Sequence, residues 1–327
     1  MIKIIKYTAI CLTLLLLVLG SIAYYLLFIP YIPPPELPGT FQHNTLLVEE
    51  RHRTFNAYIP FDLPEQPAVI FVLHGSGQTG EIVRGLAHFE FDLLADQHKF
   101  ILVYPEGLAK NWNDCRASAD YYANKINLNE NLFFQSMIDY MVENYNANRS
   151  KVFAAGYSNG GHMAYKLAYE MPDEFKAVAS IAANLPVDSN SDCTKSNKPV
   201  SVAIFVGLDD DINPYEGGLV EVMGNTSRGS VMSAQDSAGY WKTLAGANTS
   251  ATAYTFPELD NNKSTSVERL DWQNDKGINI RLYTLKGSGH VIPSKTARFP
   301  RMLGAEARDI SGPQEIVDFF LAPNTTN

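Results

Sequence analysis

The chain has 327 residues, of which 46% are hydrophobic and 19% are charged, so it can bury the core of a large domain and is not expected to be disordered. Its formal net charge of −9 is spread along the chain without the basic clusters that a phosphate backbone requires, so nucleic acid is excluded as an expected partner. Three cysteines, none of them in a Cys-x-x-Cys or Cys/His spacing, exclude a dense disulfide scaffold and predict no metal site.

Residues 1–29 carry Lys3 and Lys6 and then an almost unbroken apolar run. The run is long enough to span a bilayer, which predicts an uncleaved signal-anchor and makes the membrane an expected partner of this segment. The alternative is a signal peptide cleaved after the small residues Ser21 and Ala23, but the run continues past Ala23, which favours the anchor. In both interpretations the lysines stay in the cytoplasm, so the rest of the chain is expected to be exported, either membrane-anchored or secreted.

The proline-rich residues 30–44 predict an extended spacer, and a single catalytic domain is expected over residues 45–327. Two segments near its start, "NTLLVEE" and "HRTFNAYIP", predict an antiparallel pair of strands. Helical patterns at 131–145, 160–171 and 313–321 accompany later apolar runs, and this alternation predicts an α/β fold with a mostly parallel sheet covered by helices on both faces. The predicted buried strands are residues 68–74, 100–105, 151–156, 177–183, 200–207 and 278–287.

The third of these runs, residues 151–156, leads into Gly-Tyr-Ser-Asn-Gly and then into a predicted helix. A Gly-x-Ser-x-Gly sequence between a strand and a helix is typical of a nucleophile elbow, a turn so sharp that larger side chains than glycine would clash. The turn exposes the Ser158 hydroxyl and places the Asn159 N–H at a helix N-terminus, where it can stabilise an oxyanion. We therefore expect Ser158 to be a nucleophile and the Asn159 N–H to be an oxyanion donor.

Three other predicted strand ends carry groups that would complete such a site, because ligands gather at the carboxyl ends of parallel strands. A glycine-rich turn follows residue 74, and the Ser76 N–H is the expected second oxyanion donor. Asp209, Asp210 and Asp211 follow the strand at 200–207, and the position alone does not choose among them. His290 follows the strand at 278–287, so the chain order is Ser, Asp, His, as expected of an α/β-hydrolase.

From about residue 45 to 321 the chain resembles the polyhydroxybutyrate depolymerase-like and feruloyl or acetylxylan esterase-like carbohydrate esterases of the α/β-hydrolase superfamily. The resemblance lies in "VLHGSGQTG", "FILVYPEGLAKNWN", "VFAAGYSNGGHMAYKLAYEMPDEFKAVASIAANLP", "VGLDDDINPYEGG", "SAQDSAGYWKTLAG" and "LKGSGHVIP". It implies Ser158 as the nucleophile, His290 as the base, Asp210 as the acid, Ser76 and Asn159 as the oxyanion donors, and Trp112 as a residue bordering the substrate pocket. It also implies a serine esterase that needs no cofactor.

The expected substrate is a small-molecule or oligomeric carboxylic ester of the short-chain, feruloyl, acetyl or 3-hydroxybutyrate type. Two other functions fit the same residues: a prolyl-oligopeptidase-like serine peptidase, and a non-catalytic exported binding protein on a hydrolase scaffold. Cys115 and Cys193 are the two cysteines of the expected domain, and both lie in loops after strands. Export to an oxidising compartment makes a disulfide between them an expectation, with two separate thiols as the alternative.

Overall fold

The computed structural model of the chain describes residues 2–247, 250–259 and 264–322. Residue 1 and residues 323–327, the outer ends of the first and last expected segments, lie outside the described residues. The short 3-10 helices of the described chain are η1 (Leu108–Lys110), η2 (Asp188–Asn190) and η3 (Arg301–Leu303).

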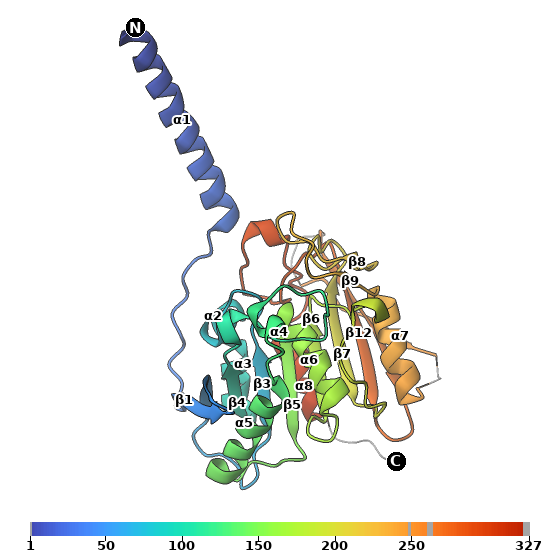
Figure 1. The fold of residues 1–327 in the computed structure, drawn as a ribbon. Helices are drawn as coiled ribbons and strands as arrows, with labels where there is room; N and C mark the ends of the chain where they lie inside the picture. The colour runs from blue at the N-terminus through green and yellow to red at the C-terminus, as the bar shows by residue number, and fades with distance from the viewer. Residues whose placement is uncertain (1, 248–249, 260–263, 323–327) are drawn as a thin grey trace.

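The core of the fold is a sheet that has ten strands within the described residues, in the order β1-β2-β4-β3-β5-β6-β7-β12-β11-β10. The six strands from β4 to β12 in this order run parallel to one another, and antiparallel strands extend both edges (Figure 1). β8 and β9 form a separate two-stranded sheet. The strands are β1 (Thr40–Val48), β2 (Arg51–Ile59), β3 (Val69–Leu73), β4 (Ile101–Pro105), β5 (Val152–Tyr157), β6 (Ala177–Ile181), β7 (Ser201–Gly207), β8 (Gly218–Leu219), β9 (Ser230–Val231), β10 (Thr252–Thr255), β11 (Ser266–Gln273) and β12 (Asn279–Lys286).

Helices pack on both faces of this sheet. One hydrophobic cluster joins α5, α6 and α7 to one face, and a second joins α2, α3 and α8 to the other. The mostly parallel α/β architecture predicted from the sequence is therefore confirmed. The helices are α1 (Ile2–Leu27), α2 (Gly80–Leu86), α3 (Glu90–His98), α4 (Tyr122–Lys125), α5 (Glu130–Tyr145), α6 (Asn159–Glu170), α7 (Ala234–Ala245) and α8 (Gly312–Leu321).

The local sequence explains these elements. Every residue of β3, β4, β5 and β6 is buried, because helices cover both faces and the strands can be apolar along their whole length. Hydroxyl side chains cap two helices that pack on the sheet: Ser233 accepts a hydrogen bond from the Asp236 N–H at α7, and Ser311 accepts one from the Gln314 N–H at α8. Each cap satisfies a backbone donor that the helix cannot, which fixes where the helix begins.

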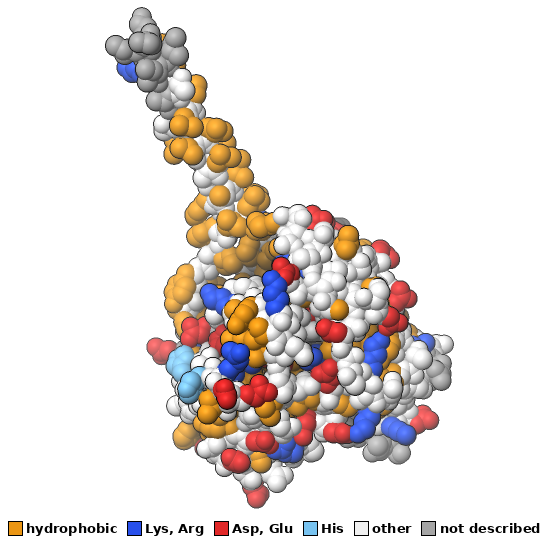
Figure 2. Space-filling model, in the orientation of Figure 1, with side chains coloured by type: hydrophobic (Ala, Val, Ile, Leu, Met, Phe, Trp, Pro, Cys, Tyr) orange, Lys and Arg blue, Asp and Glu red, His pale blue; other side chains and the backbone are white. Residues whose placement is uncertain are grey.

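The N-terminal helix α1 projects away from the packed domain (Figure 1). Its segment Lys6–Leu27 is long and apolar enough to cross a membrane, with a mean hydropathy of 2.4, and none of it is buried against the protein. Apolar side chains cover its visible surface, whereas acidic and basic side chains are scattered over the domain (Figure 2). The end of α1 touches the domain at η3, where Arg301 Nη1 donates to the Tyr25 carbonyl oxygen over 3.0 Å.

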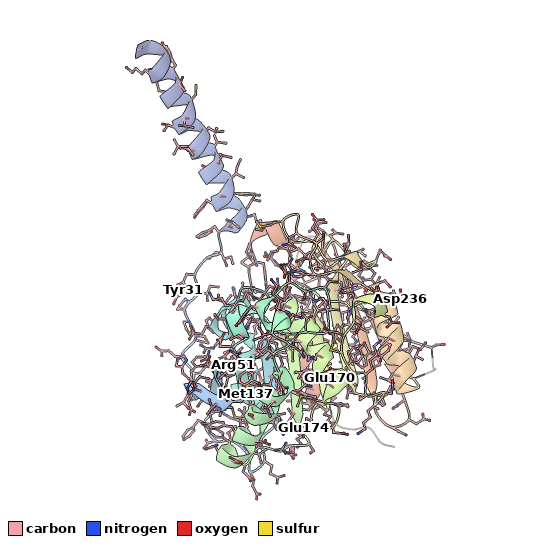
Figure 3. All side chains as sticks on the ribbon, in the orientation of Figure 1. Tyr31, Arg51, Met137, Glu170, Glu174 and Asp236 are labelled. Atoms are coloured by element: carbon pink, nitrogen blue, oxygen red, sulfur yellow. A yellow bond between two sulfur atoms is a disulfide. The ribbon has the colours of Figure 1, made fainter. Side chains whose placement is uncertain are left out.

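The segment between α1 and β1 is irregular and contains Tyr31, which is 84% exposed and stands apart from the packed side chains (Figure 3). The expected antiparallel pair of strands is confirmed as β1 and β2, with Thr40 opposite Ile59. β1 begins at Thr40, before the expected domain start at residue 45. The proline-rich spacer is correspondingly shorter, because the residues after it already pair with β2.

Candidate active site

The expected site residues gather at the carboxyl ends of the parallel strands, around a cavity of about 160 Å³. Ser76, Ser158 and His290 all line this cavity, and they come from the ends of β3, β5 and β12. Its wall is made by Gly75, Ser76, Gln78, Arg116, Tyr121, Tyr157, Ser158, His162, Ile212, Asn213, Val220, Val222, Arg228, His290 and Leu303.

Ser158 occupies a tight turn between β5 and α6. Its φ of 56° and ψ of −117° lie in a region that a residue with a side chain rarely adopts. The turn needs its glycines: a Cβ on Gly156 would lie 1.9 Å from the Gly160 carbonyl oxygen, and a Cβ on Gly160 would lie 2.3 Å from the Leu73 carbonyl oxygen. The backbone is held because the Ser158 N–H donates to the Ile181 carbonyl oxygen of β6 over 2.8 Å. The predicted elbow is therefore present in the fold.

Ser158, His290 and Asp210 form one chain of hydrogen bonds. The Ser158 hydroxyl oxygen lies 2.9 Å from His290 Nε2, and His290 Nδ1 lies 2.8 Å from Asp210 Oδ2. Asp210 is buried, and its other carboxylate oxygen accepts the N–H groups of Ile212 and Asn213 over 2.9 and 2.8 Å. Those two bonds fix the carboxylate so that Oδ2 points at the imidazole.

The neighbours of Asp210 face elsewhere. Asp209 and Asp211 are both exposed, and among the described residues neither hydrogen-bonds to a histidine. The structure thus brings one of the three candidate aspartates to His290, and it is the one that the family resemblance implied.

The turn after β3 is anchored by a buried neutral histidine. Burial lowers the pKa of His74 to about 4, so its ring is uncharged near neutral pH. Its Nε2 accepts the Gly107 N–H over 2.9 Å, and we assign the ring proton to Nδ1, which donates to the Gly75 carbonyl oxygen over 2.8 Å. Within the described residues, the N–H groups of Ser76 and Asn159 have no hydrogen-bond acceptor. Both expected oxyanion donors are therefore free to bind another group.

Trp112 does not border the cavity, contrary to the expectation. Its side chain is completely buried, and its indole N–H donates to the His74 carbonyl oxygen over 2.9 Å. Its backbone N–H donates to Asn159 Oδ1 over 2.9 Å. Trp112 therefore supports the turn at His74 and the elbow from beneath, because the loop after β4 turns the indole into the core and leaves Arg116 and Tyr121 at the cavity wall.

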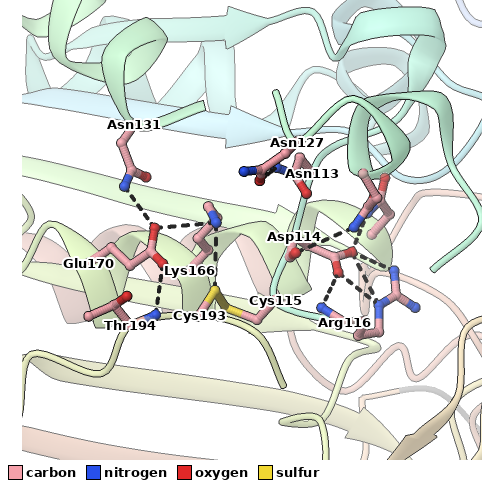
Figure 4. Close-up of a disulfide and its surroundings, with 12 residues drawn as sticks. Asn113, Asp114, Cys115, Arg116, Asn127, Asn131, Lys166, Glu170, Cys193 and Thr194 are labelled. Atoms are coloured by element: carbon pink, nitrogen blue, oxygen red, sulfur yellow. Dashed lines mark hydrogen bonds and ion pairs between the residues drawn. A yellow bond between two sulfur atoms is a disulfide. The ribbon is translucent and has the colours of Figure 1, made fainter. Parts of the chain in front are cut away.

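The same loop contains a buried ion pair and a disulfide (Figure 4). Asp114 accepts a 2.6 Å hydrogen bond from Asn159 Nδ2 and pairs with the Arg116 guanidinium, and all three side chains are buried. Cys115, between the two charged residues, is joined to Cys193 in the segment before β7. The loop is thus fastened on one side to the elbow helix and on the other to the chain that leads to Asp210.

Several residues of the cavity wall were not singled out from the sequence. Arg116 and Tyr121 follow Cys115 in a loop after a strand end, so their position beyond β4 was a usable signal. Val220, Val222 and Arg228 lie in the segment that contains β8 and β9, whose sequence has no periodicity that predicts which side chains turn inward. Leu303 reaches the cavity from η3, beside the contact with α1.

Comparison with known proteins identifies an esterase family. The model of the family described as "Putative esterase" matches residues 48–252, a range that includes Ser158 and Asp210. The "Putative esterase NocK" of Nocardia uniformis subsp. tsuyamanensis is 27% identical over 79% of this chain and 75% of its own length. "Feruloyl esterase B" of Neurospora crassa is 34% identical over a shorter stretch, 38% of this chain and 41% of that protein.

A solved structure shares the fold. The acetyl xylan esterase from Aspergillus awamori superposes with a TM-score of 0.54 and covers 78% of this chain and 96% of its own, at 18% sequence identity. At that identity the likeness supports the α/β-hydrolase fold.

Proposed function

The chain belongs to this esterase family and is a carboxylic ester hydrolase, and from that premise we propose that it works through a covalent acyl-enzyme on Ser158. The observation that carries the proposal is the unbroken hydrogen-bond chain from the Ser158 hydroxyl through His290 to the buried Asp210. A hydroxyl at that distance from a neutral imidazole can lose its proton as it attacks a carbonyl carbon.

The reaction proceeds in two halves. Ser158 Oγ bonds to the ester carbon while His290 Nε2 takes the hydroxyl proton, and Asp210 stabilises the imidazolium that forms. The carbonyl oxygen becomes negative and is held by the N–H groups of Ser76 and Asn159. The intermediate collapses when His290 returns the proton to the leaving alcohol, and a water molecule then repeats the sequence on the acyl-enzyme to release the acid and Ser158. These steps use the chain's own residues, and the proposal includes no cofactor.

Short acyl esters and oligomeric esters are the proposed substrates, because the cavity, at about 160 Å³, is small. The relatives named for feruloyl and acetylxylan esterase activity add aromatic and acetyl esters of carbohydrates to this set. Oligomers of 3-hydroxybutyrate are the third class of proposed substrate.

We further propose that α1 anchors the protein in a membrane and that the domain faces the exported side. The support is the length and hydropathy of Lys6–Leu27 and the two lysines that precede most of the apolar run. In this proposal the chain has three parts: the anchor α1, a spacer after it, and a catalytic domain that begins at β1.

Labelling with a fluorophosphonate, followed by mass spectrometry of the labelled peptide, tests the nucleophile. Ser158 should be the modified residue, Ser158→Ala should abolish both labelling and ester hydrolysis, and the exposed Ser150→Ala should change neither. A panel of p-nitrophenyl acetate, methyl ferulate, acetylated xylan and 3-hydroxybutyrate oligomers ranks the substrates. Faster cleavage of peptide amides than of every ester would favour the peptidase, and a protein that neither labels nor cleaves would be a binding protein.

A further inference from the structure

The wall of the active-site cavity is basic although the chain as a whole is acidic. The formal net charge is −9, yet neither aspartate nor glutamate occurs among the described residues that line the cavity. Two arginines do, Arg116 and Arg228, from the loop after β4 and from the segment just before β9. The local charge therefore opposes the charge of the whole molecule, which favours an anionic group at this position.

The two arginines differ in what neutralises them. Arg116 is buried and pairs with Asp114, its Nη2 lying 2.5 Å from a carboxylate oxygen. Arg228 is partly buried, and no carboxylate of the described residues lies within ion-pair distance of it. Asp114 already neutralises Arg116, so of the two only Arg228 has a positive charge that no described carboxylate compensates and that a ligand can pair with.

Arg228 is also held in place. Its Nε donates to the Tyr121 hydroxyl oxygen over 2.8 Å, and its guanidinium carbon lies 5.4 Å from the centroid of the Tyr121 ring. The Tyr121 hydroxyl lies 2.6 Å from Ser76 Oγ, in the turn that carries the proposed oxyanion donor. Because Nε is occupied and Nη1 makes a 3.4 Å contact with the Asn225 carbonyl oxygen, Nη2 is the part of the guanidinium with no partner in the described chain. A guanidinium held this way loses little side-chain entropy when it binds an anion.

A second group in the wall lacks an acceptor. Asn213 Oδ1 accepts the Asn184 N–H over 3.3 Å, so we assign its Nδ2 as the donor to His162 Nε2, 3.2 Å away. Burial, with Arg116 and His290 nearby, lowers the pKa of His162 well below its usual value, so the ring is neutral and its proton lies on Nδ1. That atom is buried and has no hydrogen-bond partner among the described residues. A buried donor left unpaired is costly, and because His162 lines the cavity, a ligand oxygen that reaches Nδ1 would remove that cost.

We propose that Arg228 binds a carboxylate of the substrate, and that the enzyme prefers esters that carry a free carboxylate besides the ester bond. The acid end of a hydroxy-acid oligomer and the half-ester of a dicarboxylic acid are of this class. Arg228 would receive the carboxylate while the ester carbonyl lies at Ser158, with His162 Nδ1–H donating to an oxygen of the same substrate. This assignment rests on the proposed function, in which Ser158 is the nucleophile.

The test compares the linear dimer of 3-hydroxybutyrate with the same dimer capped as a primary amide, which differs in charge and hardly in shape. Wild-type protein should cleave the internal ester of the free acid with a kcat/KM about tenfold or more above that of the amide, mostly through KM. Arg228→Gln should bring this ratio close to one, and Arg228→Lys should keep part of it. The matched control is Arg51→Gln, an equal change of charge at the exposed first residue of β2, which does not line the cavity, and it should keep the ratio.

Binding to Ser158→Ala protein, measured by calorimetry, separates this proposal from the catalytic one. The free acid should bind about tenfold or more tightly than the amide, and a second substitution, Arg228→Gln, should remove the difference. Equal affinity for acid and amide in Ser158→Ala, or an acid preference that survives Arg228→Gln, overturns the carboxylate assignment. A preference seen in binding without any ester cleavage by wild-type protein would support the carboxylate site and refute the proposed function instead.

Discussion

Asp210 is distinguished from its two neighbours by what its carboxylate touches. It alone of the three meets His290, and two backbone N–H groups orient it. Asp210→Asn should keep the fold but lower kcat by about 10⁴-fold, because the amide cannot hold the required imidazole tautomer and charge. Asp209→Asn and Asp211→Asn are matched controls at exposed positions and should retain most activity. Steady-state kinetics of the three variants on p-nitrophenyl acetate checks this. A severe loss of activity in Asp209→Asn or Asp211→Asn, with Asp210→Asn still active, would show that the acid is not Asp210.

His74 makes the stability of the protein depend on pH. Its pKa is lowered by burial to about 4 in the folded state, against an ordinary value of 6.5, so both states are neutral above pH 6.5. Between pH 6.5 and 4 the unfolded chain binds a proton that the folded chain does not, and the free energy of unfolding falls. By pH 5 this loss amounts to about 2 kcal/mol from His74.

The non-titrating variant His74→Gln isolates this effect. It should be less stable than wild type at pH 7, because the hydrogen bonds of His74 to Gly107 and Gly75 are changed. The stability difference should shrink by about 2 kcal/mol when urea unfolding is repeated at pH 5, since the variant has no such proton to bind. His52→Gln, at an exposed position, is the control. A difference between wild type and His74→Gln that stays constant from pH 7 to pH 5 would contradict the assignment of a buried neutral ring.

How far single residues can be predicted depends on what fixes them. The convergence of Ser158 and His290 was predictable because local sequence places both at strand ends, and strand ends of a parallel sheet converge. Choosing Asp210 needed the family resemblance, because consecutive residues of a loop share the same pattern. Trp112 was misplaced and Arg228 was missed for one reason: the direction of a loop side chain is set by tertiary packing, about which neighbouring residues carry no signal.

At the level of elements, the strands and helices of the core were predictable and the edges were less so. Fully apolar runs predicted β3 to β7, since both faces of these strands are buried. β11 alternates only partly between buried and half-buried positions, and every residue of β10 is exposed. Such strands are stabilised by pairing with β12 and with each other, and pairing partners far apart in sequence leave no local pattern.

The disulfide joins two loops that local structure alone does not hold together. It links positions separated by 78 residues, and closing a loop of that length should stabilise the fold by about 4 kcal/mol through the unfolded chain. Urea unfolding of Cys115→Ala/Cys193→Ala should show this loss, and wild-type protein unfolded with a reductant present should show a similar one. Because the loop also carries Arg116 and the backbone bond to Asn159, kcat/KM should fall as well.

Thiol counting gives an independent check of the same link. Denatured, non-reduced protein should contain one free thiol, from Cys11, and Cys11→Ala should contain none until a reductant exposes two. Two free thiols in non-reduced Cys11→Ala protein would rule out the bridge.

At the scale of the whole molecule, the proposed membrane anchor α1 meets the domain close to the active site. The helix ends at Leu27, and its last turn contacts η3 through the bond from Arg301 to the Tyr25 carbonyl oxygen. Leu303 of η3 lines the active-site cavity, so part of the cavity wall lies next to the end of α1. In an anchored enzyme this part of the cavity wall would lie close to the membrane.

Membrane anchoring and signal-peptide cleavage predict mature proteins that differ in their first residue and in whether they stay in the membrane. Cleavage after Ala23 would leave Tyr24 as the first residue, whereas the apolar segment continues through Leu27 and favours retention of the whole helix. We expect the intact mass to include α1, and the protein to stay in the membrane pellet through high salt and alkaline carbonate, because about 20 buried apolar residues hold far more strongly than surface charge. Deletion of residues 1–39 should release a domain that hydrolyses p-nitrophenyl acetate with unchanged kcat/KM, since none of residues 2–39, the described part of that segment, lines the cavity. Arg301→Ala is the control: it breaks the contact to Tyr25 but should leave the protein in the pellet. A mature chain that begins at Tyr24 and is found in the soluble fraction would show that the segment is a signal peptide.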